Sequence, residues 1–171
     1  MHPQAYNWVK RFAVNEPVDV LDIGGRDING SVRDLFPGAA SYTVLDIRPG
    51  PNVHIVADAS TWEPAREWHV IVCCEVFEHT DVWPGIIRTA YKACAPGGVF
   101  ILTMAGPGRP EHSAIDGAWG LKPGEYYKNV SVEELERELI DAGWDVVEVD
   151  YRQSPCDTRA VARKPRGKGN S

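Results

Sequence analysis

The segment EVFEHT, from Glu75 to Thr80, concentrates three side chains that can do chemistry. Glu75, Glu78 and His79 are spaced i, i+3 and i+4, so a helical turn here would place them on one face. A neutral imidazole can take a proton near neutral pH, which makes His79 a candidate general base. Carboxylates and imidazoles also suit Mg²⁺, Mn²⁺ or Co²⁺. In a third interpretation, Glu75 contacts a ligand or is structural, and Glu78 with His79 only packs and caps.

Three aspartates stand at the ends of apolar runs. Asp22 is the penultimate residue of VDVLDI, Asp46 is the penultimate residue of YTVLDI, and Asp58 follows NVHIVA. In open α/β sheets, ligands bind beyond the carboxyl ends of the strands. A carboxylate at Asp46 suits the hydroxyls of a ribose, Asp58 can accept from an adenine amino group, and Asp22 can accept from an ammonium group. Each aspartate could instead be a turn or helix-cap residue. Their common position favours a ligand that combines ribose, adenine and a positive charge.

The turn GGRDING follows the first of these aspartates and begins with Gly24 and Gly25. Glycines there let the backbone pass close to a ligand and tolerate a positive φ. Their spacing matches neither a dinucleotide fingerprint nor a phosphate loop. The turn therefore disfavours a nicotinamide-dependent oxidoreductase, which is the weakest of the functional alternatives.

The elements that must position these residues alternate along the chain. Near-continuous apolar runs, typical of strands covered on both faces, lie at 18–23, 41–47, 52–57, 69–75 and 98–104. Helical spacing marks 3–13, 31–36, 83–94 and 130–144, the last with a capping box at Ser131 and Glu134. The pattern predicts a parallel sheet wound by helices on both faces, closed by an antiparallel pair at 145–153 and 157–164. Residues 105–129 are too rich in Gly and Pro for regular structure and indicate a functional loop.

Composition limits the classes of protein that fit. A chain of 171 residues, 43% hydrophobic, predicts one globular domain, which we place at 1–164 with a disordered basic tail at 165–171. A net charge of -6 argues against duplex nucleic acid as a partner. The four cysteines form no C-x-x-C pair, and no apolar run indicates a signal peptide or a membrane span. We expect a cytoplasmic protein without a membrane partner, monomeric or homodimeric.

Taken in order, the motifs resemble those of a class I S-adenosylmethionine-dependent methyltransferase of the small type 11 group. The resemblance covers about residues 17–164 and rests on VLDIGGRDINGS, YTVLDIRPG, ADAS, VIVCCEVFEHT and ACAPGGVFILTM. It implies a single Rossmann-like, three-layer α/β domain. Its seven-stranded, mostly parallel sheet would have the order 3-2-1-4-5-7-6, with strand 7 antiparallel. The implied cofactor is S-adenosyl-L-methionine, and the implied product is S-adenosyl-L-homocysteine.

The resemblance also implies the cofactor-binding residues. Those expected at the methionine end, around the ribose and adenine, or in contact with the cofactor are Asp22, Gly24, Gly25, Arg26, Asn29, Asp46, Ile47, Asp58, Ala59 and Glu75. This chain departs from the family pattern by carrying Arg26 and Ile28 at the second and third glycine positions of the first motif. Arg26 or Asn29 is therefore expected to supply contacts that the backbone supplies elsewhere.

The chemistry at the acceptor stays open between the three interpretations of EVFEHT. The E-x-x-E-H string is similar to the magnesium site of ubiquinone-pathway O-methyltransferases and small-RNA 2′-O-methyltransferases. In that interpretation Glu75, Glu78, His79 and His112 hold Mg²⁺ or Mn²⁺ against the acceptor oxygens. We expect O-methylation of a small-molecule acceptor, with His79, Glu78 and His112 as catalytic residues. The alternative from another class is a non-catalytic interaction module that binds S-adenosylmethionine or a nucleotide.

Overall fold

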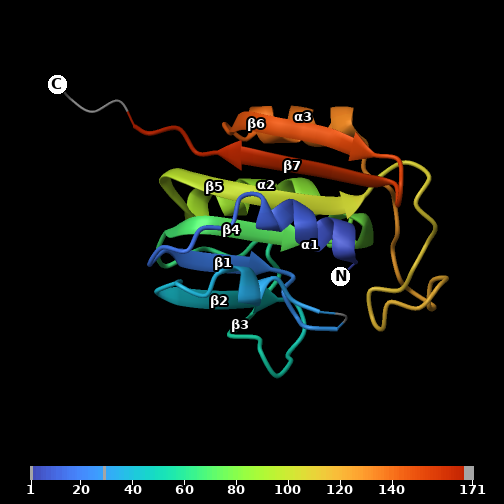
Figure 1. The fold of residues 1–171 in the computed structure, drawn as a ribbon. Coiled ribbons are helices and arrows are strands. Elements are labelled where there is room, and N and C mark those ends of the chain that lie inside the picture. Colours follow the sequence, from blue (N-terminus) through green and yellow to red (C-terminus); the bar gives the residue numbers. More distant parts are fainter. Residues whose placement is uncertain (1, 29, 168–171) are drawn as a thin grey trace.

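The computed structural model describes residues 2–28 and 30–167, and its middle layer is a seven-stranded sheet in the order β3-β2-β1-β4-β5-β7-β6 (Figure 1). The strands are β1 (Asp19–Ile23), β2 (Ser41–Asp46), β3 (Ile55–Val56), β4 (Trp68–Cys74), β5 (Cys94–Ala105), β6 (Asp145–Arg152) and β7 (Asp157–Arg163). Neighbours from β3 to β5 pair in parallel, whereas β7 is antiparallel to both β5 and β6. The predicted sheet order and the antiparallel strand are confirmed.

Helices cover both faces of the sheet, as predicted. Helix α1 (Pro3–Lys10) lies on one face, and α2 (Trp83–Ala93) and α3 (Val132–Asp141) lie on the other (Figure 1). The capping box at the start of α3 is present, with Ser131 Oγ accepting from the Glu134 backbone and Glu134 accepting from the Ser131 backbone. The helix predicted at 31–36 is wrong, because the chain forms only a 3₁₀ turn at Arg33–Leu35. The segment 31–36 is followed directly by Pro37 and Gly38, and six residues form too few helical hydrogen bonds to offset the cost of helix nucleation.

Two hydrophobic clusters fix the layers, one on each face of the sheet. Alternate residues of β1 divide between them: Val20 packs with Trp8 of α1, and Leu21 packs with Ile87 of α2. Because side chains alternate along a strand, a sheet buried on both faces needs apolar residues at nearly every position. This explains the near-continuous apolar runs of the sequence.

The carboxyl ends of the parallel strands gather at one edge, where the N-terminus also lies (Figure 1). Residues 106–131, which join β5 to α3, extend past this edge (Figure 1) and contain an isolated β-bridge between His112 and Trp119. The prediction of an irregular segment here is confirmed. Of the predicted tail, residues 168–171 lie outside the described residues, as does Asn29.

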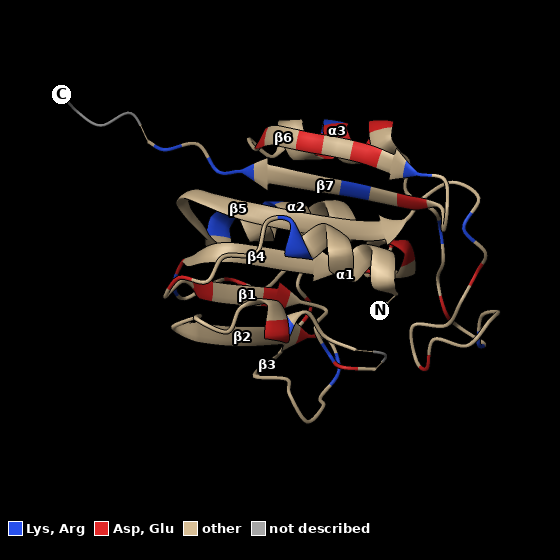
Figure 2. Ribbon diagram, viewed as in Figure 1, with Lys and Arg blue, Asp and Glu red and all other residues tan. Residues whose placement is uncertain are grey.

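Charged residues of both signs mix along the outer strands β6 and β7 (Figure 2). Arg159 pairs with Asp150 across these strands, and Arg11, just beyond α1, pairs with Glu148. Within residues 2–28 and 30–167, no helix has both the length and the apolar character needed to cross a membrane.

Candidate active site

A cleft of about 860 Å³ opens at the carboxyl edge of the sheet. Its walls come from the turn after β1, the ends of β2 and β4, and the long loop 106–131. The predicted cofactor-binding residues that the structure describes all line it: Asp22, Gly24, Gly25, Arg26, Asp46, Ile47, Asp58, Ala59 and Glu75. The structure thus brings these residues into one cavity. Their contact with a cofactor stays a prediction.

The turn after β1 needs glycine at two successive positions. Gly24 has φ +72°, and a Cβ there would lie 2.3 Å from Cγ2 of Val76. At Gly25 a Cβ would lie 2.4 Å from the carboxyl carbon of Asp22. The Gly24 amide also donates to the carbonyl of Leu45, 2.7 Å away. A side chain at either position would push the turn away from the sheet edge, which explains this glycine pair.

Asp22 lies under this turn and is only 4% exposed. The Tyr42 hydroxyl donates to its Oδ2 atom at 2.7 Å. Burial raises the pKa of Asp22 to about 7; the Tyr42 hydrogen bond opposes this rise and the charge of Asp46 adds to it. Asp22 is therefore a carboxyl group poised between its two protonation states near neutral pH.

Asp46 and Asp58 both have local partners while lining the cleft. Asp46 accepts from the backbone amides of Arg26, at 3.2 Å, and Arg48, at 2.9 Å. Asp58 Oδ1 accepts from the amide and the hydroxyl of Ser60, at 2.8 and 2.7 Å. Asp58 is thus a turn residue, as one of its two interpretations predicted. A carboxylate oxygen has more than one acceptor site, so these bonds leave room for a ligand.

The EVFEHT segment does not form the helical turn that would place its three side chains on one face. Glu75 adopts φ +57°, and a 3₁₀ turn begins only at Phe77. The Glu75 side chain therefore diverges and accepts from Thr103 Oγ1 at 3.1 Å. Of the four residues expected around a metal, the structure brings together Glu78, His79 and His112, and it directs Glu75 elsewhere.

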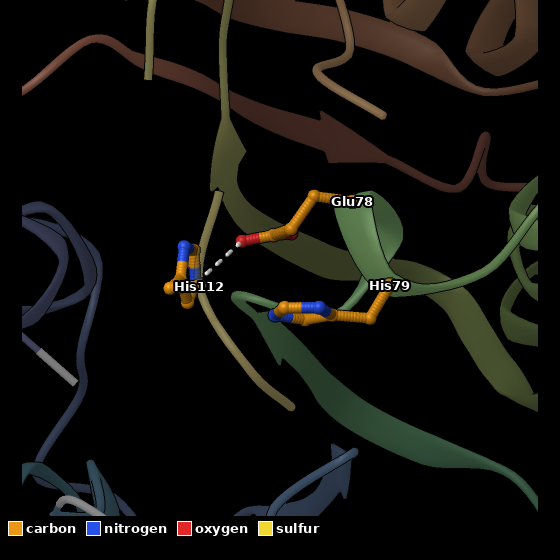
Figure 3. A group of neighbouring side chains, drawn as sticks. All are labelled: Glu78, His79 and His112. Carbon is orange, nitrogen blue, oxygen red and sulfur yellow. Dashed lines mark ion pairs between the residues drawn. The ribbon is translucent and has the colours of Figure 1, made fainter. Parts of the chain in front are cut away.

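Glu78, His79 and His112 converge from the 3₁₀ turn and the long loop (Figure 3). Each offers one ligand atom, and these atoms lie within 4.8 Å of one another. The dashed line in Figure 3 joins Glu78 Oε1 to His112 Nε2 at 3.9 Å, which is too long for a hydrogen bond. The rings of His79 and His112 meet edge to face, and the ring of Tyr127 packs against both.

This cluster leaves buried polar atoms unsatisfied. Glu78 is 0% exposed, and in the described part of the chain neither of its carboxylate oxygens has a hydrogen-bond partner, nor has Nδ1 of His79. Burial, together with the charge of Glu75, raises the pKa of Glu78 well above its ordinary value. Burial and the neighbouring His112 lower the pKa of His79 to about 4. A buried carboxyl group without a hydrogen-bond partner is costly, so the residues of this cluster suit a proton donor or a cation. One carboxylate and two imidazoles fit a divalent cation.

A second charged cluster includes residues that the sequence did not single out. His2 Nε2 lies 3.3 Å from both Glu75 Oε2 and Asp157 Oδ2. Arg109 Nη2 lies 3.5 Å from Glu75, and its Nη1 donates to the fully buried Asp157. Burial alone would lower the pKa of His2, but hydrogen bonds and charges from Asp157 and Glu75 raise it to about 9. Burial would raise the pKa of Glu75, and His2 with Arg109 lowers it instead. His2, Glu75 and Arg109 all line the cleft.

Aromatic residues of the long loop stand at the mouth of the cleft. Trp119, which is 78% exposed, and Tyr126 both line it. Trp83 does not, because its ring stacks on Phe77 at the edge of the core. The side of the cleft formed by the long loop therefore carries an aromatic rim.

Comparisons with known proteins agree with this architecture. The sequence model of a family described as a methyltransferase domain matches residues 2–149. No curated protein matches the chain by sequence.

Three solved structures illustrate the likeness in fold. An S-adenosylmethionine dependent methyltransferase from Mesorhizobium loti is 15% identical, with a TM-score of 0.66 over 94% of this chain and 98% of that one. The 1,6-didemethyltoxoflavin-N1-methyltransferase of Burkholderia thailandensis, with bound 1,6-didemethyltoxoflavin and S-adenosylhomocysteine, is 15% identical, with a TM-score of 0.71 over 95% and 77%. The N-methyltransferase NodS of Bradyrhizobium japonicum WM9 is 18% identical, with a TM-score of 0.65 over 95% and 96%.

Proposed function

The chain belongs to the methyltransferase domain family, and on this premise we propose that it is an S-adenosylmethionine-dependent methyltransferase acting on a small-molecule acceptor. The observation that carries the proposal is the cleft of about 860 Å³ at the carboxyl edge, lined by the glycine turn after β1 and by acidic residues at the ends of β1, β2 and β4. Parallel α/β sheets bind their ligands at this edge. The cited toxoflavin enzyme binds S-adenosylhomocysteine and a small acceptor, which supports both parts of the proposal by analogy of fold.

The chain's own residues suggest how the cofactor is held. Gly24 and Gly25 allow the backbone to approach the amino-acid end, and Asp46 has acceptor sites left for the ribose hydroxyls. Ile47 is an exposed apolar side chain in the cleft, suited to pack on adenine. When bound, the cofactor supplies a sulfonium methyl group as the electrophile. The protein's main task is then to align this group with a nucleophile.

We assign the acceptor side of the cleft to His79 and His112, which line it, and we propose that together with the buried Glu78 they hold a divalent cation such as Mg²⁺ or Mn²⁺ beside an acceptor hydroxyl. The buried carboxyl group of Glu78 supports this assignment, because neither of its oxygens has a hydrogen-bond partner among the described residues. A cation bound there would lower the pKa of the hydroxyl, as metal ions do for bound water. His79 acting alone as general base is the alternative for the same transfer to oxygen.

Thermal unfolding with added ligands tests the proposal. S-adenosylmethionine and S-adenosylhomocysteine should raise the melting temperature, since a ligand at about 100 times its Kd stabilises the folded state by about 2.7 kcal/mol. NADH should not. Mn²⁺ should add a further rise that is lost in His112→Ala and kept in His69→Ala, because His69 lies on β4 and does not line the cleft.

Each outcome separates the hypotheses. A shift with S-adenosylhomocysteine but no effect of Mn²⁺ would leave His79 as the base. Binding of S-adenosylmethionine without methyl transfer to any member of a panel of acceptors would favour the non-catalytic interaction module. No shift with either sulfur ligand would refute the proposed function.

A further inference from the structure

The Tyr42 hydroxyl reaches Asp22, a residue of the cleft wall, from the neighbouring strand β2. In the register of β1 and β2, Val20 pairs with Tyr42 and Asp22 pairs with Val44. Since side chains alternate along a strand, Tyr42 lies on the same face of the sheet as Asp22 and diagonal to it. Its ring is buried beside Phe36, which fixes where the hydroxyl points.

Asp22 is confined from two sides. On the side of strand β2, the Tyr42 hydroxyl donates to Asp22 Oδ2 at 2.7 Å. The backbone of Gly25 lies directly over the carboxylate, so closely that a Cβ there would be 2.5 Å from Oδ2 and 2.8 Å from Oδ1. The carboxylate can neither turn away nor collect a shell of water. Its ionised form must therefore be supported by the protein or by a ligand.

The groups that act on the Asp22 charge are few. Tyr42 and Asp46, which act on it beside burial, both come from β2. Burial and Asp46 both disfavour the ionised form of Asp22, and the hydrogen bond from Tyr42 favours it. Among the described residues, no ion pair includes Asp22. A cationic ligand group over the Gly24-Gly25 turn is the partner that this carboxylate lacks.

We propose that Tyr42 is a positioning residue for cofactor binding: through its hydrogen bond it keeps the Asp22 carboxylate ionised and aimed at the turn that receives the ammonium group of the cofactor. The inference rests on the proposed function and adds to it a residue outside the cleft wall. Tyr42 acts on the cofactor only through Asp22. The burial of Asp22 makes the affinity for a cationic ligand depend on pH, because protonated Asp22 has no charge to offer, and the Tyr42 hydrogen bond moves this dependence to lower pH.

Two ligands and one pair of variants test the inference. S-adenosylhomocysteine carries the ammonium group, and 5′-methylthioadenosine lacks it while sharing the ribose and adenine. In the wild-type protein, S-adenosylhomocysteine affinity measured by calorimetry should fall about tenfold per pH unit below the pKa of Asp22, and 5′-methylthioadenosine affinity should not. In Tyr42→Phe the midpoint of this fall should move up by about one pH unit. Tyr91→Phe, at the other face of the sheet beside Trp144, should leave it unchanged.

A second measurement needs no cofactor. The Asp22 carboxyl group, followed by NMR in the ligand-free protein, should titrate at higher pH in Tyr42→Phe than in the wild type. If Tyr42→Phe does not fold, Asp22→Asn takes its place, and its S-adenosylhomocysteine affinity should be low and independent of pH over the same range.

The outcomes are distinct. An unchanged midpoint in Tyr42→Phe, an equal loss of affinity for both ligands, or a retained pH dependence in Asp22→Asn would overturn the role of Tyr42 and leave the proposed function standing. Failure of the wild-type protein to bind either ligand at any pH would overturn the proposed function and this inference with it.

Discussion

The imidazole of His2 and the carboxylate of Glu75 form an ion pair, with Nε2 and Oε2 3.3 Å apart. This contact ties the start of the chain to the end of β4, at the wall of the cleft. Asp157 and Arg109 complete a cluster of two cations and two carboxylates around it. The N-terminal segment is thereby part of the candidate active site.

The His2 contacts predict a specific dependence of stability on pH. Its pKa of about 9 in the folded protein exceeds the ordinary value of 6.5. Folding therefore favours the protonated form, so this contribution to stability is complete below pH 6.5 and is lost as the pH rises to about 9. Urea unfolding should show the wild-type free energy of unfolding falling across this window. In His2→Gln the free energy of unfolding should fall less over the same pH range. A fall identical to that of the wild type would contradict the ion pairs of His2.

The glycine turn predicts different costs for two similar substitutions. Gly24 and Gly120 both have positive φ, but only at Gly24 would a Cβ meet a neighbour, Cγ2 of Val76. Backbone strain should cost each of Gly24→Ala and Gly120→Ala about 1 kcal/mol of stability. Gly24→Ala should lose more than this, because its Cβ also meets Val76. It should also bind S-adenosylhomocysteine at least about tenfold more weakly than the wild type. Adding Val76→Ala should restore part of the loss. Equal losses in the two single variants would count against a turn held close to the sheet.

The unpaired Glu78 carboxyl predicts that one substitution stabilises the protein. In the metal-free protein, Glu78→Met should raise the free energy of unfolding by about 1–2 kcal/mol, because it removes a buried polar group whose oxygens have no hydrogen-bond partner among the described residues. The same variant should lose the response to Mn²⁺. The matched control is Glu134→Met, which should lose about 1 kcal/mol because Glu134 belongs to the capping box of α3. A destabilised Glu78→Met would mean that the carboxyl has partners.

Substitution of Asp46 should weaken the binding of every ligand that contains the ribose of the cofactor. Asp46→Asn should weaken S-adenosylhomocysteine and 5′-methylthioadenosine alike by about tenfold, the effect of losing a charged hydrogen-bond acceptor. Asp27→Asn, in the turn after β1 but absent from the cleft wall, should change neither affinity. If only S-adenosylhomocysteine were weakened, Asp46 would contact the amino-acid end instead.

Much of the fold could be predicted because it depends on local pattern. The runs of β1, β2, β4 and β5 are apolar at successive positions, and their ends fall within a few residues of prediction. β3 is an exception: six residues were expected, and only Ile55–Val56 pair. This segment lies at the sheet edge, where pairing on one side alone decides how long a strand becomes.

The cofactor side of the cleft was foreseeable for the same reason, since parallel strands end at a common edge. The charged cluster was not, because His2 and Arg109 are 107 positions apart and meet only through tertiary packing. The direction of Glu75 was equally hidden, because it depends on a positive φ at a residue that is not glycine. Neither feature leaves a periodic signal in the sequence.

The reversed direction of β7 has a practical consequence. Because this strand starts at the cleft edge with Asp157 and runs to the opposite edge, the described chain leaves the sheet on the side away from the cleft (Figure 1). His2, the first residue that the structure describes, in contrast lines the cleft. An affinity tag or a surface-immobilisation handle therefore belongs at the C-terminus, where it leaves the entrance for small molecules clear, whereas an N-terminal fusion would crowd it.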